Sequence, residues 1–298
     1  MNIRILATTM LAAGAMLAAG AASAADAPLS KVSFDKALHD RLPDAIKKAG
    51  RMTSVENGSF PPYTIVEGTK FSGATSDMEQ ALAKLLGVKI EDANVGGLPA
   101  LLTGINAHRY ELSLGPIGDF KSREGANDFV DWVKEYVVFA VHKGNPKGIT
   151  SLDTSCGHRI AVMAGGSAER VIQHQSDVCK KAGKPAVTVQ SYTDQPSSIL
   201  AVRSNRADAF FSSQAPLTYF VQEAHGQLQL SGTGQPNGFH DLFQGAVVPK
   251  GSPLGPVLVD AFKELIKSGA YADVMKKWHL EGNMIDKPGI NLGGVIPK

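Results

Sequence analysis

Residues 159–170 read RIAVMAGGSAER, a strand, a turn and the start of a helix in immediate succession. The apolar run at 159–162 predicts a buried strand, and Gly165-Gly166-Ser167 predicts a tight turn that opens a helix. Backbone N–H groups at the start of a helix point outward and can bind an anion. The alternative interpretation of the same residues is an ordinary turn with an N-cap.

Strand and helix patterns alternate along the rest of the chain. A helix is predicted to open at Ser76, with Glu79 completing a capping box, and to end at Gly87. The tail after Pro288 is predicted to be irregular. Further helices are predicted around residues 98–105, 257–266 and 271–278, and strands at 52–55, 111–114, 136–141, 187–189, 208–211 and 245–248. The alternation predicts an α/β fold with largely parallel sheets.

Residues 1–24 predict a cleaved secretory signal peptide. Arg4 precedes an apolar run at 5–22, and Ala22-Ser23-Ala24 forms a small-residue cleavage site. A membrane anchor is the alternative, but the run is rich in Ala and Gly and stops at the cleavage site. No cysteine follows to accept a lipid, so we expect a free periplasmic protein. The remaining length of about 270 residues suggests two domains.

Composition excludes several classes of function. The 30 Lys and Arg residues balance 28 Asp and Glu residues without long charged blocks, so no nucleic-acid partner is expected. The sequence contains no phosphate-binding loop, dinucleotide motif, nucleophile elbow or pair of His residues at metal spacing. We therefore expect no cofactor, no metal and no catalytic residue.

The two cysteines, Cys156 and Cys179, would both be exported to a compartment that permits disulfides. A bridge between them is favoured because each is the other's only possible partner, and two free buried thiols are the alternative.

Several predicted strand ends carry groups suited to a small anion. Arg123 follows the strand that ends at Leu114, where it could bind a carboxylate through two parallel hydrogen bonds, although a solvated surface arginine is the alternative. Phe60 and Tyr63, next to Pro61-Pro62, could wall a pocket or belong to the core.

These motifs, taken in order, resemble the extracellular solute-binding proteins that serve polar amino-acid ABC importers. The resemblance covers nearly the whole mature chain. It rests on Phe60-Pro61-Pro62-Tyr63, Gly73, Arg123 with Asp128-Phe129-Val130, Gly166-Ser167, Arg206-Ala207-Asp208-Ala209, and Ser268-Gly269-Ala270-Tyr271 with Trp278.

The resemblance implies a type II periplasmic binding protein fold of two lobes, each a mixed β-sheet flanked by helices, joined by two hinge strands. Lobe 1 would comprise residues 25–137 and 241–298, and lobe 2 residues 138–240. The chain would cross between lobes near residues 134–138 and 237–244. A monomer that closes on a ligand and then meets an inner-membrane ABC permease is expected.

The resemblance also implies roles for individual residues. Arg123 would hold the ligand's α-carboxylate with help from Gly118, Gly166 and Ser167. Phe60 and Leu98 would cover the ligand's side chain. Asn57 would line its far end, where relatives that bind basic ligands tend to carry Asp, which disfavours a Lys or Arg ligand.

Two departures concern the ligand's ammonium group. Ser213 stands where relatives usually carry the Asp that pairs with it, and Phe120 replaces a hydroxyl-bearing residue. Either Asp119 supplies the missing carboxylate, or the ligand has no free amine.

Two other functions remain possible on this scaffold. A periplasmic enzyme similar to cyclohexadienyl dehydratase would need a general acid or base, for which Asp119 and Glu56 are the candidates. A ligand-sensing protein would need a separate receptor as its partner.

Overall fold

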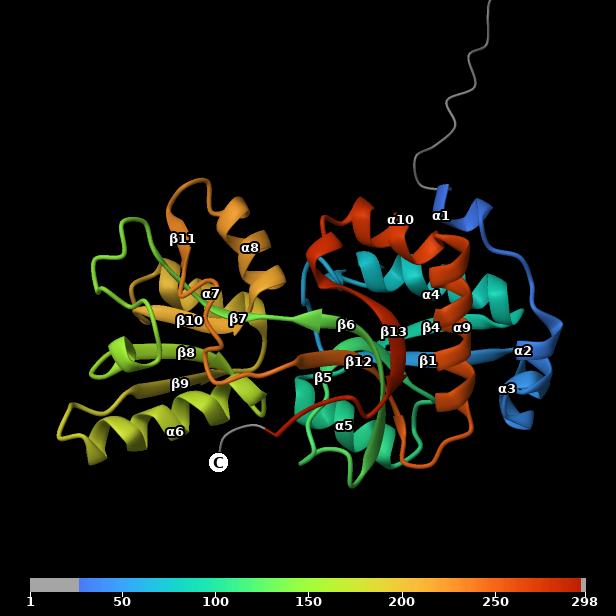
Figure 1. The fold of residues 1–298 in the computed structure, drawn as a ribbon, viewed down its shortest axis with the longest axis horizontal. Coiled ribbons are helices and arrows are strands. Elements are labelled where there is room, and N and C mark those ends of the chain that lie inside the picture. Colours follow the sequence, from blue (N-terminus) through green and yellow to red (C-terminus); the bar gives the residue numbers. More distant parts are fainter. Residues whose placement is uncertain (1–26, 296–298) are drawn as a thin grey trace, which may run out of the picture.

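The computed structural model describes residues 27–295, which form two lobes side by side (Figure 1). Each lobe is a β-sheet layer covered by helices, and two segments of chain connect the lobes. The predicted two-lobed α/β fold is therefore confirmed. The predicted signal peptide lies outside the described residues. Within residues 27–295, no helix has the length and apolar character needed to span a membrane.

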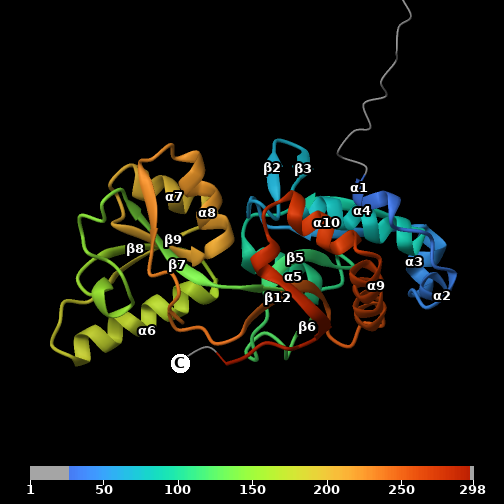
Figure 2. The ribbon, with the colours of Figure 1, turned by 45° about the horizontal axis from the view of Figure 1, so that its top comes forward.

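Lobe 1 is assembled from both ends of the chain. Its helices pack on the strands in its centre, and the hairpin of β2 and β3 forms a separate small sheet that protrudes at the top of the lobe (Figure 2). The elements are α1 (Ala27–Ser30), α2 (Lys36–Asp40), α3 (Asp44–Ala49), β1 (Arg51–Glu56), β2 (Ile65–Glu67), β3 (Lys70–Ser72), α4 (Ala74–Leu86), β4 (Lys89–Asn94), α5 (Leu98–Asn106), β5 (Ser113–Gly118), β6 (Asn127–Glu135), β12 (Leu242–Pro249), α9 (Leu254–Ser268), α10 (Ala270–Lys277), η2 (Glu281–Asn283) and β13 (Met284–Ile290).

Lobe 2 is the middle of the chain, on the left of Figure 1. Its sheet has the order β11-β7-β10-β8-β9, in which β8 is parallel to β9 and β10, whereas β7 is antiparallel to β10 and β11. The elements are β7 (Val137–His142), η1 (Asp153–Ser155), β8 (Arg159–Met163), α6 (Ser167–Lys181), β9 (Thr188–Tyr192), α7 (Gln195–Arg203), β10 (Ala209–Ser213), α8 (Gln214–Glu223) and β11 (Leu228–Ser231).

The sheets contain more antiparallel pairing than the sequence predicts. In lobe 1 only β1 and β4 pair in parallel over their length, while β13-β6-β12-β5 is antiparallel throughout. The reason lies in the crossings. Strand β6 leaves lobe 1 at Glu135 and β12 enters it at Leu242, and these two residues are paired. Two strands that cross the same gap in opposite directions pair antiparallel.

The crossings occur at Tyr136, which separates β6 from β7, and in the segment that leads from β11 to β12. From these crossings we propose the division that the sequence predicts: residues 25–137 with 241–298 for lobe 1, and residues 138–240 for lobe 2.

One local prediction is wrong. Helix α4 begins at Ala74 after Gly73, not at Ser76. Gly73 has φ +116°, and a Cβ there would lie 2.1 Å from the Tyr63 carbonyl oxygen, so only glycine permits this entry into the helix. Strand β13 continues past Pro288 only to Ile290, and residues 291–295 have no regular secondary structure, as the sequence predicts. Pro288 is tolerated within β13 because this is an edge strand with a register shift, where a missing N–H costs little.

Each lobe has its own apolar core. In lobe 1, Trp132 stacks on Phe262, and the Tyr271 hydroxyl donates a 2.8 Å hydrogen bond to the Trp132 carbonyl oxygen. Trp278 packs against the same core. In lobe 2, Asp208 accepts hydrogen bonds from the backbone N–H and the guanidinium of Arg159, which ties the ends of β10 and β8 together.

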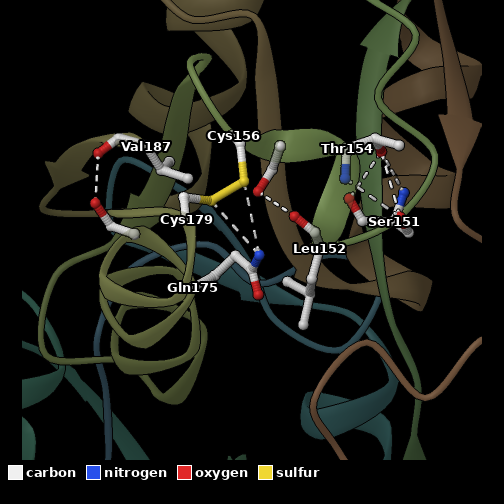
Figure 3. Close-up of a disulfide and its surroundings, with 9 residues drawn as sticks. Ser151, Leu152, Thr154, Cys156, Gln175, Cys179 and Val187 are labelled. Carbon is white, nitrogen blue, oxygen red and sulfur yellow. Dashed lines mark hydrogen bonds between the residues drawn. A yellow bond between two sulfur atoms is a disulfide. The ribbon is translucent and has the colours of Figure 1, made fainter. Parts of the chain in front are cut away.

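The predicted disulfide between Cys156 and Cys179 is present, with a Cα–Cα distance of 5.7 Å (Figure 3). It joins the loop before β8 to helix α6, and the Gln175 amide lies against both sulfur atoms. The bridge therefore anchors the helix whose first residues face the other lobe.

Reducing this bridge should destabilise lobe 2. The bridge spans a sequence separation of 23, and closing such a loop stabilises a fold by about 3 kcal/mol on the chain-entropy estimate. Urea unfolding of wild-type protein and of the Cys156→Ser/Cys179→Ser variant measures the difference. Equal unfolding free energies would contradict the stabilising role.

Candidate functional site

A cavity of about 60 Å³ lies where the two lobes meet. Lobe 1, lobe 2 and residues next to both crossings, such as Val137 and Leu242, contribute to its wall. Eight of the nine residues predicted to bind the ligand line it; only Asp119 does not. The lining residues are Glu56, Asn57, Ser59, Phe60, Leu98, Gly115, Pro116, Ile117, Gly118, Arg123, Val137, Met163, Gly166, Ser167, Ala168, Gln195, Ser212, Ser213, Leu242 and Gln244.

Arg123 is buried at the boundary between the lobes, with 7% of its surface exposed. Its Nη1 donates a 2.8 Å hydrogen bond to the Gly118 carbonyl oxygen in lobe 1, and its Nη2 donates a 3.2 Å hydrogen bond to the Gly165 carbonyl oxygen in lobe 2. The guanidinium also lies 5.2 Å from the centre of the Phe120 ring. A guanidinium has five N–H donors, so others remain to bind a carboxylate.

The charge of Arg123 persists at neutral pH. Burial, together with the positive charge of Arg170, lowers the pKa of Arg123 to about 10, while the negative charge of Asp119 opposes this shift. A buried cation without an ionised partner in the cavity favours an anionic ligand there.

The start of helix α6 supplies a second group of donors. Gly166 is the N-cap residue, and Gly166, Ser167 and Ala168 all line the cavity. The first N–H groups of a helix have no partner within the helix and carry partial positive charge. Glu169 accepts a 2.7 Å hydrogen bond from the Gly165 N–H, which fixes the turn.

The apolar wall comes mainly from lobe 1. Phe60 stacks on Tyr63 with ring centres 5.7 Å apart, and Leu98 is buried at the start of α5. Asn57 follows β1 and reaches across the cleft, where its Nδ2 lies 3.9 Å from the Met163 sulfur.

Several contacts hold the lobes together. Besides the bond from Arg123 to Gly165 and the contact from Asn57 to Met163, the Arg170 guanidinium donates a 2.9 Å hydrogen bond to the Ser122 hydroxyl. The structure is therefore a closed arrangement of the two lobes.

Asp119 is fully buried and lies outside the cavity wall. Its Oδ2 accepts a 2.6 Å hydrogen bond from the Gly293 N–H, and neighbouring Asp131 accepts one from the Leu292 N–H. Both carboxyls therefore bind the C-terminal segment.

Five polar residues of the wall were not predicted as ligand contacts. Glu56 ends β1, Ser59 lies in the loop that follows it, Gln195 begins α7, Ser212 lies in β10 and Gln244 lies in β12. Glu56 directly precedes the predicted Asn57, so its place at a strand end was the available signal. Gln244 faces the cavity only because β12 pairs with β5, a contact between distant parts of the chain.

The comparisons with known proteins agree with this geometry. The profile of the bacterial extracellular solute-binding proteins, family 3, matches residues 53–281. The chain belongs to this family.

Among relatives of this family 3 protein, the arginine-binding protein ArgT of Corynebacterium glutamicum is 24% identical over 84% of this chain and 81% of ArgT. An ancestral arginine-binding protein solved with arginine has a TM-score of 0.68 and 26% identity, over 77% of this chain and 98% of that one. An ancestral amino acid-binding protein, AncCDT-1, described as a precursor of cyclohexadienyl dehydratase, has a TM-score of 0.68 and 20% identity, over 79% and 97%.

Family membership carries the general role. Family 3 proteins are extracellular solute-binding proteins, so the general role of this chain is to bind a solute. Within residues 27–295, no group of three or more His, Cys, Asp or Glu residues is placed to hold a metal ion.

The pair Asp119 and Asp131 makes the stability of this family 3 protein depend on pH. Burial and the negative charge of Asp119 raise the pKa of Asp131 to about 9. Between about pH 4 and pH 9 the unfolded state has lost this proton and the folded state keeps it. Unfolding then releases a proton, so stability falls as pH rises through this window, by up to about 1.4 kcal/mol per pH unit.

Asp131→Asn should flatten this dependence and stabilise the protein at pH 8, because an amide needs no proton and still accepts the Leu292 N–H bond. Urea unfolding at several pH values between 5 and 9 measures the slope. An unchanged slope in the variant would rule out Asp131 as its source.

Proposed function

We propose that this protein captures a small amino acid or a related carboxylate between its lobes and delivers it to an inner-membrane ABC permease. The buried guanidinium of Arg123 carries the proposal, because it faces the cavity while it bonds to backbone carbonyls of both lobes. A carboxylate in the cavity would receive the remaining donors of Arg123 and those at the start of α6.

The proposed ligand contacts are Asn57, Phe60, Leu98, Gly118, Arg123, Gly166, Ser167 and Ser213. Asp119 is left out because its carboxylate binds the Gly293 N–H and does not line the cavity. In the closed arrangement the cavity measures only about 60 Å³, so the ligand is small or holds the lobes slightly apart. We propose that the protein acts as a monomer and that the permease binds the closed form, which ligand contacts with both lobes would favour.

ArgT and the ancestral protein named above are described as arginine-binding, which supports an amino acid as ligand. Within the proposed ligand contacts, Asn57 brings no charge to the end of the cavity where a basic side chain would need one. We therefore propose a neutral amino-acid side chain.

An enzyme on this scaffold is the alternative, and one observation favours it. Of the two acid-base candidates, Glu56 lines the cavity and Asp119 does not. If the protein were a dehydratase, a bound cyclic carboxylate would be recovered as a new product. Recovery of the ligand unchanged after incubation supports binding alone.

Replacing Arg123 by Ala should weaken ligand binding by about 2–5 kcal/mol, at least roughly thirtyfold in Kd, because it removes one partner of a buried charge pair. A thermal-shift screen of the standard amino acids and small carboxylates identifies ligands, since a ligand at a hundred times its Kd adds about 2.7 kcal/mol of stability. Calorimetry then measures Kd.

Arg109→Ala is the matched control, because it removes the same charge from an exposed arginine of the same lobe. If Arg123→Ala bound as tightly as Arg109→Ala, the assigned site would be wrong.

A further inference from the structure

Glu56 is a buried carboxyl group that the proposed function leaves unused. It ends β1, is 3% exposed and lines the cavity. Its Oε1 accepts only two long hydrogen bonds, from the Gly115 N–H and the Ser54 hydroxyl, both 3.4 Å, with a smaller contribution from Thr64. An ionised carboxylate normally forms hydrogen bonds of about 2.7–2.9 Å. The protein itself therefore solvates a charge on Glu56 poorly.

The charged groups around Glu56 are mostly acidic. The buried carboxyl group of Glu79 on α4 interacts electrostatically with Glu56, and so does the carboxyl group of Asp92, an exposed residue on β4. Among the residues that line the cavity, the basic one is Arg123. Within the described part of the chain, none of the ion pairs includes Glu56 or Glu79. The acidic side of the cavity thus lacks a cation.

A second buried acceptor in the same wall, the side-chain oxygen of Gln244, lacks a hydrogen-bond donor among the described residues. Gln244 is 5% exposed, and its Nε2 donates a 3.2 Å hydrogen bond to the Ser213 hydroxyl. Its Oε1 is buried and has no hydrogen-bond donor among the described residues. A buried acceptor left in this state costs about 1–3 kcal/mol, so the cavity wall favours a ligand that brings donors.

The positions of Glu56 and Arg123 suit a ligand with both charges. The Glu56 carboxylate accepts a hydrogen bond from the Gly115 N–H, the Arg123 guanidinium donates one to the Gly118 carbonyl oxygen, and both side chains line the same cavity. A single small molecule that carries a carboxylate and an ammonium can therefore meet both groups from within this cavity.

We propose that the ligand carries a cationic nitrogen that binds the Glu56 carboxylate, and that binding drives the proton of Glu56 into solvent. This inference rests on the proposed function and adds the ligand class: a zwitterionic amino acid rather than a simple carboxylic acid. Glu56 in lobe 1 then neutralises the ligand's ammonium, the role for which Asp119 was predicted.

The surroundings of Glu56 explain why its carboxyl group carries a proton before the ligand binds. Burial, with the charge of Asp92 adding to it, raises the pKa of Glu56 to about 8, so the empty site holds a neutral carboxyl at lower pH. A bound cation lowers that pKa again. Below about pH 8 the Kd of the ligand should therefore fall about tenfold for each unit of pH increase and level off above it.

Calorimetry on wild-type protein tests the proposal directly. Each amino acid that raises the melting temperature is titrated at pH 6.5 in phosphate and in Bis-Tris, which both buffer at this pH and whose different ionisation enthalpies reveal proton release. We expect close to one proton released per ligand, and binding at least about tenfold weaker for the matching α-hydroxy acid, which lacks the ammonium. If arginine or lysine binds, citrulline and norleucine distinguish the α-ammonium from the side-chain cation.

Glu56→Gln should release no proton and show a Kd that does not change between about pH 5.5 and pH 7.5. Asp131→Asn is the matched control: it neutralises another buried lobe 1 carboxyl that lies outside the cavity, and it should release the proton as wild-type protein does.

Amino-acid binding without proton release, or equal affinity for the α-hydroxy acid, overturns this inference and leaves the proposed function standing. If no amino acid or carboxylate binds wild-type protein, both are overturned. The wild-type measurement decides the matter even if Glu56→Gln does not fold.

Discussion

The hydrogen bonds from Arg123 to Gly118 and Gly165 are the contact on which the arrangement of the site depends. One guanidinium joins a strand end of lobe 1 to a helix-opening turn of lobe 2. In the closed arrangement two backbone carbonyls, one from each lobe, fix the position of the side chain. An anion that binds it would also meet the first N–H groups of α6, so binding and closure of the lobes would favour each other.

The fold is built so that these groups meet. Strands β6 and β12 carry the chain between the lobes in opposite directions, and the pairing of β12 with β5 places Gln244 beside Gly118. In lobe 2 the disulfide at Cys179 anchors the C-terminal part of α6, and Glu169 fixes the turn that precedes the helix. The two sides of the cavity differ in charge: the side at Arg123 and α6 is positive, while the side at Glu56 has carboxyl groups nearby.

Much of this was accessible from sequence because local patterns carried it. The strand at 159–162 with its glycine turn, Arg123 after a strand, and a single pair of cysteines are all local or compositional signals. They led to the α/β class, the disulfide, and Phe60, Arg123, Gly166 and Ser167 of the cavity wall. The resemblance to a family implied the two lobes, their assembly from discontinuous segments and the remaining predicted residues of the wall.

What the sequence could not give depends on contacts between distant residues. The start of α4 is set by Gly73 against the Tyr63 carbonyl, so the capping-box pattern at Ser76 was misleading. Asp119 lies directly after β5, next to the cavity residue Gly118, so the sequence suggested a place in the site. Its carboxylate instead accepts a hydrogen bond from the Gly293 N–H of the C-terminal segment. The antiparallel pairing of β6 with β12 and the inward position of Gln244 likewise arise only once the chain has crossed between lobes twice.

A crystal structure of the protein with a bound amino acid, chosen by thermal shift, tests the central claim most directly. We predict a ligand carboxylate within about 3 Å of the Arg123 guanidinium, between Gly118 and the start of α6. A ligand bound elsewhere, or bound in this cavity with its carboxylate away from Arg123, would contradict the account.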